Sequence, residues 1–344
     1  MKAVSFARYG GAEVLDYGTV EDPVPRQGEA LIAVEACGVN HFDIDLREGT
    51  SRIELNLPHI PGLEVVGRIA EARGEDEHLP VGTRVLVRYE HGCHNCRQCR
   101  SNQANLCAET QMFGVNRPGG YAEFTIANAV DLMPVSHVLS ASEWAATQVA
   151  FGTAWHMLVT RAGVRVGETV LINAAGSGVS SAATQIAVLN GAQVIVTAGS
   201  QHKLDRARQF GAKHGINYRE GALYEAVMDL THGRGVDLVI DHVGGSIFTD
   251  SLRVLRPGGR LVTCGGHAGE SASLDLIELF RSERQILGCR TWTRAELEDV
   301  FALIDARQLQ PVVDKTFPLS QCGDAQRYLA SRQHYGKVVI EINE

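Results

Sequence analysis

The stretch from Thr169 to Cys264 constrains the fold most, because short apolar runs typical of strands alternate there with longer helical segments. The expected strands lie at 169–173, 193–197, 215–218, 236–241 and 260–264, and the expected helices at 180–190, 203–210, 223–231 and 249–255. Each helix can carry the chain back so that the next strand runs parallel to the previous one. The sequence therefore predicts an α/β domain built on a parallel sheet.

A glycine-containing turn joins the first of these strands to the first helix. Gly176 and Gly178 allow a ligand to approach the backbone closely, with Ser177 between them. The helix that follows from Val179 offers free N–H groups to a pyrophosphate. Ser180 stands where a third glycine is usual and is small enough to keep the packing. The strand–turn–helix context predicts a dinucleotide site, with an ordinary βα turn as the alternative.

The end of the next strand bears on the choice between NADH and NADPH. An NAD site needs an acidic side chain for the ribose 2′-hydroxyl, and no Asp or Glu is present between residues 193 and 200. Gly199 supplies space, Ser200 a hydroxyl and Lys203 a cation for a 2′-phosphate. We therefore expect NADPH.

Four of the eight cysteines lie close together in the sequence, in the pattern C-x2-C-x2-C-x7-C. They are Cys93, Cys96, Cys99 and Cys107. Four thiolates complete a tetrahedral shell around Zn²⁺ and leave no position for a substrate, so we expect one structural zinc ion. The spacing departs from the bacterial ferredoxin run, but an iron–sulfur cluster and free thiols remain alternatives.

The regions flanking the α/β segment have a different character. The first 130 residues or so consist of short strands separated by Gly and Pro, which is typical of an irregular β-barrel. A helix is expected at 141–162, and a helix at 295–306 and a strand at 337–342 close the chain. With no low-complexity linker before this tail, we expect it to rejoin the first domain.

Charge and hydropathy argue against several classes of partner. The formal net charge is −8 and no long basic block occurs, so we expect no binding to nucleic acid. Residues 1–10 lack the apolar core of a signal peptide, and no run of about 18 apolar residues is present. We expect a cytoplasmic protein that binds a small molecule and no membrane.

Together these features resemble the medium-chain dehydrogenase/reductase superfamily, and within it the quinone reductase and zinc-lobe alcohol dehydrogenase branches. The matching stretches also include Gly38-Val-Asn-His-Phe-Asp, Pro61-Gly-Leu-Glu, Gly119-Gly-Tyr-Ala-Glu and Gly336-Lys-Val-Val-Ile. The resemblance covers nearly the whole chain.

The resemblance implies two domains. A GroES-like β-barrel catalytic domain would comprise residues 1–145 and 291–344, with the zinc lobe at about 91–110. A Rossmann domain, with a doubly wound parallel sheet, would comprise residues 146–290 and bind NADP. The family also pairs its last Rossmann strands across a two-fold axis, which implies a homodimer through residues 284–289.

The departures from the family pattern concern the catalytic metal. The three ligand positions of the zinc alcohol dehydrogenases fall at Asn40, Leu63 and Val149, and the proton-relaying hydroxyl falls at Phe42. Leucine and valine cannot coordinate a metal, and an asparagine oxygen is a poor lone ligand for zinc. The resemblance therefore implies a site without catalytic zinc.

The resemblance also assigns roles to particular residues. Asn40 would contact the substrate oxygen, with a turn-forming asparagine as its alternative, and Glu64 would have a catalytic or a structural role. The implied cofactor contacts are His41 with the pyrophosphate, Thr153 with the nicotinamide, Tyr218 with the adenosine phosphate, and Lys337.

Three functions remain open. The first is an NADPH-dependent reductase of quinones or α,β-unsaturated carbonyls, whose acceptors delocalise the charge that hydride transfer creates. The second is a zinc-independent alcohol dehydrogenase or ketone reductase. The third is an NADPH-binding protein with a structural or regulatory role, since a fold does not determine a function.

Overall fold

The computed structural model describes residues 1–73 and 79–342, which form two compact units. The first unit comprises Met1–Val149 and Pro311–Glu344, and the second Ala150–Gln310. The sequence places the second boundary at residue 291, whereas the structure keeps 291–310 in the second unit. The reason is packing: Glu296 binds His156 at 2.7 Å, and the Trp292 ring lies against Gly152.

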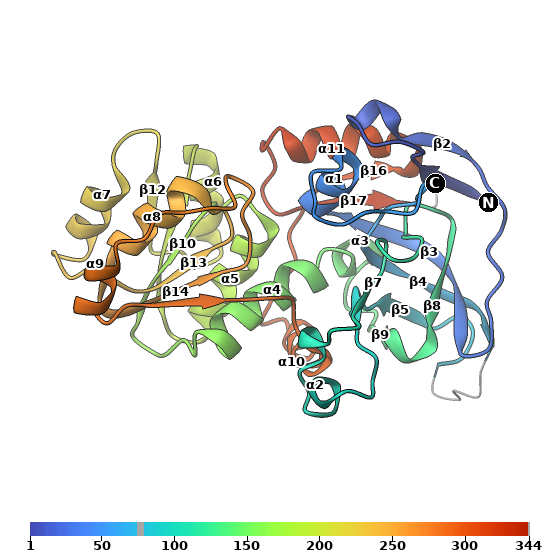
Figure 1. Ribbon diagram of the computed structural model, residues 1–344, viewed down its shortest axis with the longest axis horizontal. Coiled ribbons are helices and arrows are strands. Elements are labelled where there is room, and N and C mark those ends of the chain that lie inside the picture. The colour runs from blue at the N-terminus through green and yellow to red at the C-terminus, as the bar shows by residue number, and fades with distance from the viewer. Residues whose placement is uncertain (74–78, 343–344) are drawn as a thin grey trace. The chain divides into compact units, whose positions relative to one another are not determined.

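The second unit contains a six-stranded sheet in the order β12-β11-β10-β13-β14-β15, with every neighbouring pair parallel. The strands are β10 (Thr169–Ile172), β11 (Gln193–Ala198), β12 (His214–Asn217), β13 (Val236–Asp241), β14 (Leu255–Thr263) and β15 (Gln285–Gly288). This is the doubly wound order, in which the strand sequence reverses between β10 and β13. The predicted Rossmann domain is confirmed (Figure 1, green to orange).

Helices connect these strands and cover the sheet. They are α5 (Gly178–Leu189), α6 (Gln201–Gln209), α7 (Leu223–Leu230), α8 (Gly245–Arg253) and α9 (Leu276–Arg281), followed by α10 (Arg294–Asp305). Val227 of α7 and Leu252 of α8 are buried in one apolar cluster with sheet residues such as Val239. The alternating apolar runs of the sequence therefore produce this core directly, by placing branched side chains between sheet and helices.

The segment 141–162, which the sequence predicts as one helix, is broken. It consists of α3 (Ala141–Trp144), π-helical turns at Gln148–Gly152 and His156–Arg161, and α4 (Thr153–Trp155). Gln148 is buried and its side chain binds the backbone of an earlier segment, donating to the Val87 carbonyl at 2.8 Å and accepting from the Tyr89 N–H at 3.0 Å. These long-range bonds fix the wider turns that interrupt regular helix.

The first unit is built on a seven-stranded sheet in the order β16-β17-β3-β4-β5-β9, with β8 paired to β3. The strands are β3 (Glu29–Val39), β4 (Glu64–Arg73), β5 (Arg84–Val87), β8 (Phe124–Asn128), β9 (Leu132–Pro134), β16 (Val313–Pro318) and β17 (Lys337–Glu341). β17 pairs antiparallel with β3, with Ile340 opposite Cys37, so the end of the chain rejoins the first domain as expected.

Smaller elements complete the first unit. They are β1 (Lys2–Ser5), β2 (Asp16–Thr19), α1 (His41–Glu48), β6 (Glu90–His91), α2 (Arg97–Arg100), β7 (Gln111–Met112), α11 (Cys322–Ala330) and the 3₁₀ turns Ala12–Val14, Ala104–Leu106, Ala129–Asp131 and Leu319–Gln321. Apolar side chains of β1, α1 and α11 join the sheet in one cluster that includes Val39, Val65 and Val338. Within the described ranges, no helix has the length and apolar character needed to cross a membrane.

Candidate functional site

A buried polar cluster in the first unit brings together Asn40, Glu64 and Lys337. Asn40 follows the end of β3, Glu64 begins β4 and Lys337 begins β17. Because β3 pairs with both other strands, three segments far apart in the sequence converge here. Their exposed fractions are 9% for Asn40, 0% for Glu64 and 6% for Lys337.

Lys337 points into this cluster. Its Nζ lies 2.8 Å from Glu64 Oε2, donates to Asn40 Oδ1 at 2.6 Å and donates to the Val39 carbonyl at 3.1 Å. An ammonium group has three hydrogens, so these contacts account for all of them.

Glu64 is surrounded by donors. Its Oε1 accepts from the Val149 N–H at 2.9 Å, while Oε2 faces Lys337 and accepts from Asn40 Nδ2 at 3.4 Å. A fully buried carboxylate requires such partners, because an unpaired buried charge is costly. Two of the three positions where zinc dehydrogenases have ligands, Asn40 and Val149, thus bind this carboxylate, and the third, Leu63, is 2% exposed.

Asn40 also caps α1. The Asn40 N–H donates to Asp43 Oδ2 at 2.8 Å, and the Asp43 N–H donates back to the Asn40 carbonyl at 3.1 Å. The Tyr121 hydroxyl donates to the same Asp43 oxygen at 3.2 Å. The cap fixes the backbone of Asn40, so that only its side-chain torsions remain to be determined by Glu64 and Lys337.

Burial raises the pKa of Asp43 from 3.8 to about 7, against the opposing effects of the Asn40 N–H and Lys337. The folded protein then holds this proton more tightly than the unfolded chain. This stabilisation is complete below about pH 4 and is lost as the pH rises through about 7. We expect Asp43→Asn, which keeps the acceptor oxygen, to remove that dependence.

Urea unfolding of wild type and Asp43→Asn between pH 4 and 8 measures this effect. Wild type should lose stability relative to Asp43→Asn as the pH rises toward 7. Above about pH 8, the difference between their free energies of unfolding should be constant. If the free energies of unfolding of the two proteins change in parallel from pH 4 to 8, Asp43 keeps an ordinary pKa in the folded protein.

The glycine-containing turn lies between β10 and α5, which is the strand–turn–helix context that the sequence predicts. Ser177 is the N-cap of α5, and its hydroxyl accepts from the Ser180 N–H at 2.9 Å. Ser180 is fully buried, and its own hydroxyl donates to the Asn173 carbonyl at 2.6 Å. The serine in place of a third glycine therefore ties the helix to β10. A Cβ at Gly176 would lie 2.7 Å from Lys203 Nζ, so the lysine ammonium lies beside the turn.

A basic cluster surrounds the end of β11. A Cβ at Gly199 would lie 2.6 Å from the Tyr218 hydroxyl and 3.0 Å from Arg219 Nε. Ser200 follows as the N-cap of α6. The structure thus brings both Tyr218 and Arg219 next to Gly199. The sequence analysis did not include Arg219, although a basic residue directly after Tyr218 was a signal for it.

Two further candidates lie outside these clusters. His41 is the first residue of α1, and its ring lies 6.4 Å from that of His334 in the first unit. Thr153 begins α4 in the second unit and is 9% exposed. Gly178 and Val179 open α5, where the first N–H groups of a helix lack partners within the helix.

The four cysteines of the predicted zinc lobe form one cluster. Their sulfur atoms all lie within 4.8 Å of one another, and Cys96 and Cys107 Sγ are 3.8 Å apart. Backbone N–H groups of Cys93, Cys96 and Cys99 point at sulfur atoms within the cluster, at 3.3–3.5 Å. Such bonds stabilise thiolates, and the four sulfurs fit a closed tetrahedral shell.

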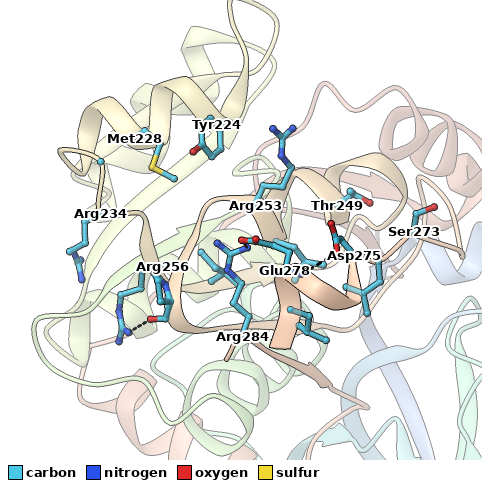
Figure 2. Close-up of a pocket in the computed structure, with 16 residues that line it drawn as sticks. Tyr224, Met228, Arg234, Thr249, Arg253, Arg256, Ser273, Asp275, Glu278 and Arg284 are labelled. Carbon is cyan, nitrogen blue, oxygen red and sulfur yellow. Dashed lines mark hydrogen bonds and ion pairs between the residues drawn. The ribbon is translucent and has the colours of Figure 1, made fainter. Parts of the chain in front are cut away.

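A cavity of about 510 Å³ in the second unit lies away from the turn. Arg234, Leu255 and Arg256 line it near the starts of β13 and β14, whereas the turn follows the carboxyl end of β10. In a parallel sheet, the amino ends of the strands and their carboxyl ends lie at opposite ends of the sheet. Figure 2 shows Arg253 and Tyr224 beside it, with the guanidinium 5.3 Å from the ring centre. It therefore lies at the other end of the sheet from the glycine-containing turn.

Comparisons with known proteins agree with this geometry. The family model described as alcohol dehydrogenase GroES-like domain matches residues 26–137, and that described as zinc-binding dehydrogenase matches residues 178–306. The quinone oxidoreductase-like protein 2 of Bos taurus is 30% identical over 337 residues, covering 94% of this chain and 88% of its own. A zinc-type alcohol dehydrogenase-like protein of Schizosaccharomyces pombe is 31% identical, covering 92% and 91%.

A solved structure has the same fold over the full length. The crystal structure of an NAD-dependent alcohol dehydrogenase is 35% identical, with a TM-score of 0.95, and covers 100% of both chains. Both domains and the order of their motifs are thus shared with known oxidoreductases. The chain belongs to the medium-chain dehydrogenase/reductase superfamily, whose members are oxidoreductases that bind a nicotinamide cofactor.

Proposed function

We propose that the protein is an NADPH-dependent reductase of quinones or α,β-unsaturated carbonyls that works without catalytic zinc. The observation that carries this proposal is the buried ammonium of Lys337, 2.8 Å from Glu64 and 2.6 Å from Asn40. Relatives named quinone oxidoreductase support it further.

The chemistry of the cluster does not suit a metal ion. Asn40, Leu63 and Val149 provide no thiolate, imidazole or carboxylate, which are the ligands that zinc prefers. The one carboxylate, Glu64, already faces three donors, and the ammonium beside it would repel a cation. Electrophilic help in this site is therefore limited to hydrogen bonding.

Because the site offers only hydrogen bonds, it suits acceptors that stabilise most of the developing charge themselves. When bound, NADPH supplies a hydride, and the negative charge then develops on the acceptor. A quinone or enone spreads that charge onto its oxygen by conjugation, so a neutral N–H donor is sufficient to stabilise it. We assign this donor to Asn40 Nδ2, whose contact with Glu64 is long at 3.4 Å and can be replaced by a substrate oxygen.

Rates with three acceptors test the proposal. With NADPH and a metal chelator that leaves the cysteine cluster loaded, we expect turnover of 2-cyclohexenone and of benzoquinone, and none of cyclohexanone. Reduction of cyclohexanone at a similar rate would contradict the proposal. Tight NADPH binding with no turnover of any acceptor would favour a structural or regulatory protein.

One observation favours a second candidate, a zinc-independent alcohol dehydrogenase or ketone reductase. The solved NAD-dependent alcohol dehydrogenase is 35% identical over the full length. In that case alcohol oxidation with NADP⁺ should proceed and resist chelators.

For the cofactor, we propose that Ser200, Lys203, Tyr218 and Arg219 hold the 2′-phosphate of NADPH beside Gly199. The basic cluster and the absence of Asp or Glu at the end of β11 support this. Gly176, Ser177, Gly178 and Val179 would bind the pyrophosphate, aided by His41, and Thr153 would lie beside the nicotinamide.

Removing either basic group should therefore weaken NADPH selectively. We expect Lys203→Ala and Arg219→Ala each to raise the KM for NADPH about 10- to 100-fold, because a charge-assisted hydrogen bond contributes about 1.5–3 kcal/mol. The KM for NADH should not change. Arg208→Ala is the control, since Arg208 lies on α6 but pairs with Asp205. An equal rise in the KM for NADPH and in the KM for NADH would contradict this assignment.

We further propose that Cys93, Cys96, Cys99 and Cys107 bind one structural Zn²⁺. The sulfur cluster leaves no position for substrate, so this ion would order the lobe and take no part in hydride transfer. A thiolate site also suits a reducing compartment, and we propose that the protein is cytoplasmic.

The sheet edge supports a homodimer. β15 is the last strand of its sheet, and the neighbouring α9 exposes Leu276, Ile277 and Phe280 to 65%, 56% and 66%. An unpaired strand beside exposed apolar side chains is a surface that pairs with another copy. We propose that two chains join along β15. Light scattering should give twice the mass of 37.2 kDa.

A further inference from the structure

The contacts of Lys337 determine which way the amide of Asn40 faces. An ammonium group has donors and no acceptor, so the Asn40 atom 2.6 Å from Lys337 Nζ must be the oxygen Oδ1. The nitrogen Nδ2 then faces the other way, where the Gly38 carbonyl and Glu64 Oε2 accept from it at 3.2 and 3.4 Å. All three neighbours favour the same orientation.

Glu64 in turn holds the ammonium in place. Three donors meet its carboxylate, from Val149, Lys337 and Asn40. A glutamine here would offer one acceptor oxygen and one donor nitrogen, and the donor would meet another donor. Hydrogen bonds therefore connect Val149, Glu64, Lys337 and Asn40 in a fixed chain. The chain ends at the Asn40 side chain, which we assign to the substrate oxygen.

The three hydrogens of Lys337 meet Glu64, Asn40 and Val39, so protein groups hold its ammonium in place. We propose that Lys337 is a positioning residue that keeps the N–H face of Asn40, and not its carbonyl face, toward the substrate oxygen. This inference rests on the proposed function. Without the ammonium, only the two longer contacts with the Gly38 carbonyl and Glu64 hold this orientation, so Asn40 flips more readily and presents an oxygen to the oxygen that gains negative charge.

Kinetics of Lys337→Met, Lys337→Arg, Asn40→Ala and the Lys337→Met/Asn40→Ala pair test this inference with NADPH and 2-cyclohexenone. We expect Lys337→Met and Asn40→Ala each to lower kcat about 100-fold, as removal of one donor to a developing oxyanion does. The Kd for NADPH should stay within about twofold, since Lys337 does not contact it in this account. The pair should be no slower than Asn40→Ala alone, because both changes remove one interaction.

The conservative variant and a distant lysine supply controls. Lys337→Arg keeps a donor-only cation and should recover much of the lost kcat. Lys213→Met removes a lysine bonded to Gln193 on the surface and should leave kcat unchanged. A raised Kd for NADPH with an unchanged kcat, or losses that add in the pair, would overturn the inference.

Lys337→Met leaves Glu64 buried without its cation, which strongly destabilises the fold. Lys337→Met/Glu64→Gln replaces both charges and keeps an acceptor for the Val149 N–H. The new amide nitrogen would face Asn40 Nδ2, which again favours the flipped orientation. This variant should fold and show the same loss of kcat. A folded variant with wild-type kcat would overturn the inference.

A readout without substrate separates this inference from the proposed function. In protein labelled with ¹⁵N-asparagine, the side-chain amide signals of Asn40, identified with Asn40→Ala, should shift and exchange faster with solvent in Lys337→Met/Glu64→Gln. If wild type reduces neither enones nor quinones but these signals change, the proposed function fails and the positioning role stands. Unchanged signals would overturn the positioning role, whatever the enzyme reduces.

Discussion

Gly38→Ala is expected to destabilise the first unit and to abolish most of the activity. A Cβ at this position would lie 2.3 Å from the Ala145 carbonyl oxygen and 2.6 Å from Glu64 Oε2. The carbonyl belongs to the backbone and cannot move aside easily, so the strand or Glu64 must shift. Overpacking of this kind costs roughly 1–3 kcal/mol. Because Asn40 donates to the Gly38 carbonyl, the shift also disturbs the proposed substrate contact.

Urea unfolding and steady-state kinetics with 2-cyclohexenone measure both effects. Gly221→Ala is the matched control, because a Cβ there would meet no atom within 4 Å. We expect the control to match wild type in both measurements, and Gly38→Ala to lose at least tenfold in kcat. A Gly38→Ala protein with wild-type stability and rate would mean that Glu64 does not occupy the position described.

Cys99→Ser is expected to release the zinc ion and lower the melting temperature. A structural zinc site contributes free energy directly to the fold, and losing it should cost about 3 kcal/mol or more. For a unit of this size, that corresponds to a fall of roughly 6–12 °C. The cause would be loss of order in the lobe, since the four sulfurs that converge within 4.8 Å are its shared contact.

Metal analysis of purified protein, with calorimetry, checks this expectation. Wild type should contain one zinc ion per chain, and Cys99→Ser much less. Cys289→Ser, outside the cluster, should retain the full amount. Two zinc ions per chain in wild type would contradict the proposal that the site works without catalytic zinc, and iron in place of zinc would identify the alternative cluster.

The sequence predicts the second unit well because its signals are local. Most strands are short apolar runs, and the helices α5 to α8 each begin within a few residues of the expected start, as α5 does at Gly178 rather than Ser180. The cysteine cluster is similarly local, since all four ligands lie within fifteen residues of one another. Spacing alone is therefore enough to predict both features.

Features that depend on distant contacts are not predicted. The hydrogen bond between Lys337 and Asn40, which lies 297 residues away in the chain, has no signal in the sequence. The break in the expected helix at 141–162 arises from bonds of Gln148 to a segment about 60 residues earlier. Neither contact leaves a periodic pattern in the sequence, because each depends on how strands pair.

The position of the transferred hydride tests the central claim most directly. The protein is incubated with 2-cyclohexenone and NADPH carrying deuterium at both C4 positions, and the product is examined by NMR. The account predicts cyclohexanone with deuterium at the former β-carbon, because a site with only hydrogen-bond donors favours the acceptor that stabilises its own charge. An allylic alcohol with deuterium on the carbonyl carbon would contradict it, since the site would then activate a carbonyl without the metal that such activation was expected to need.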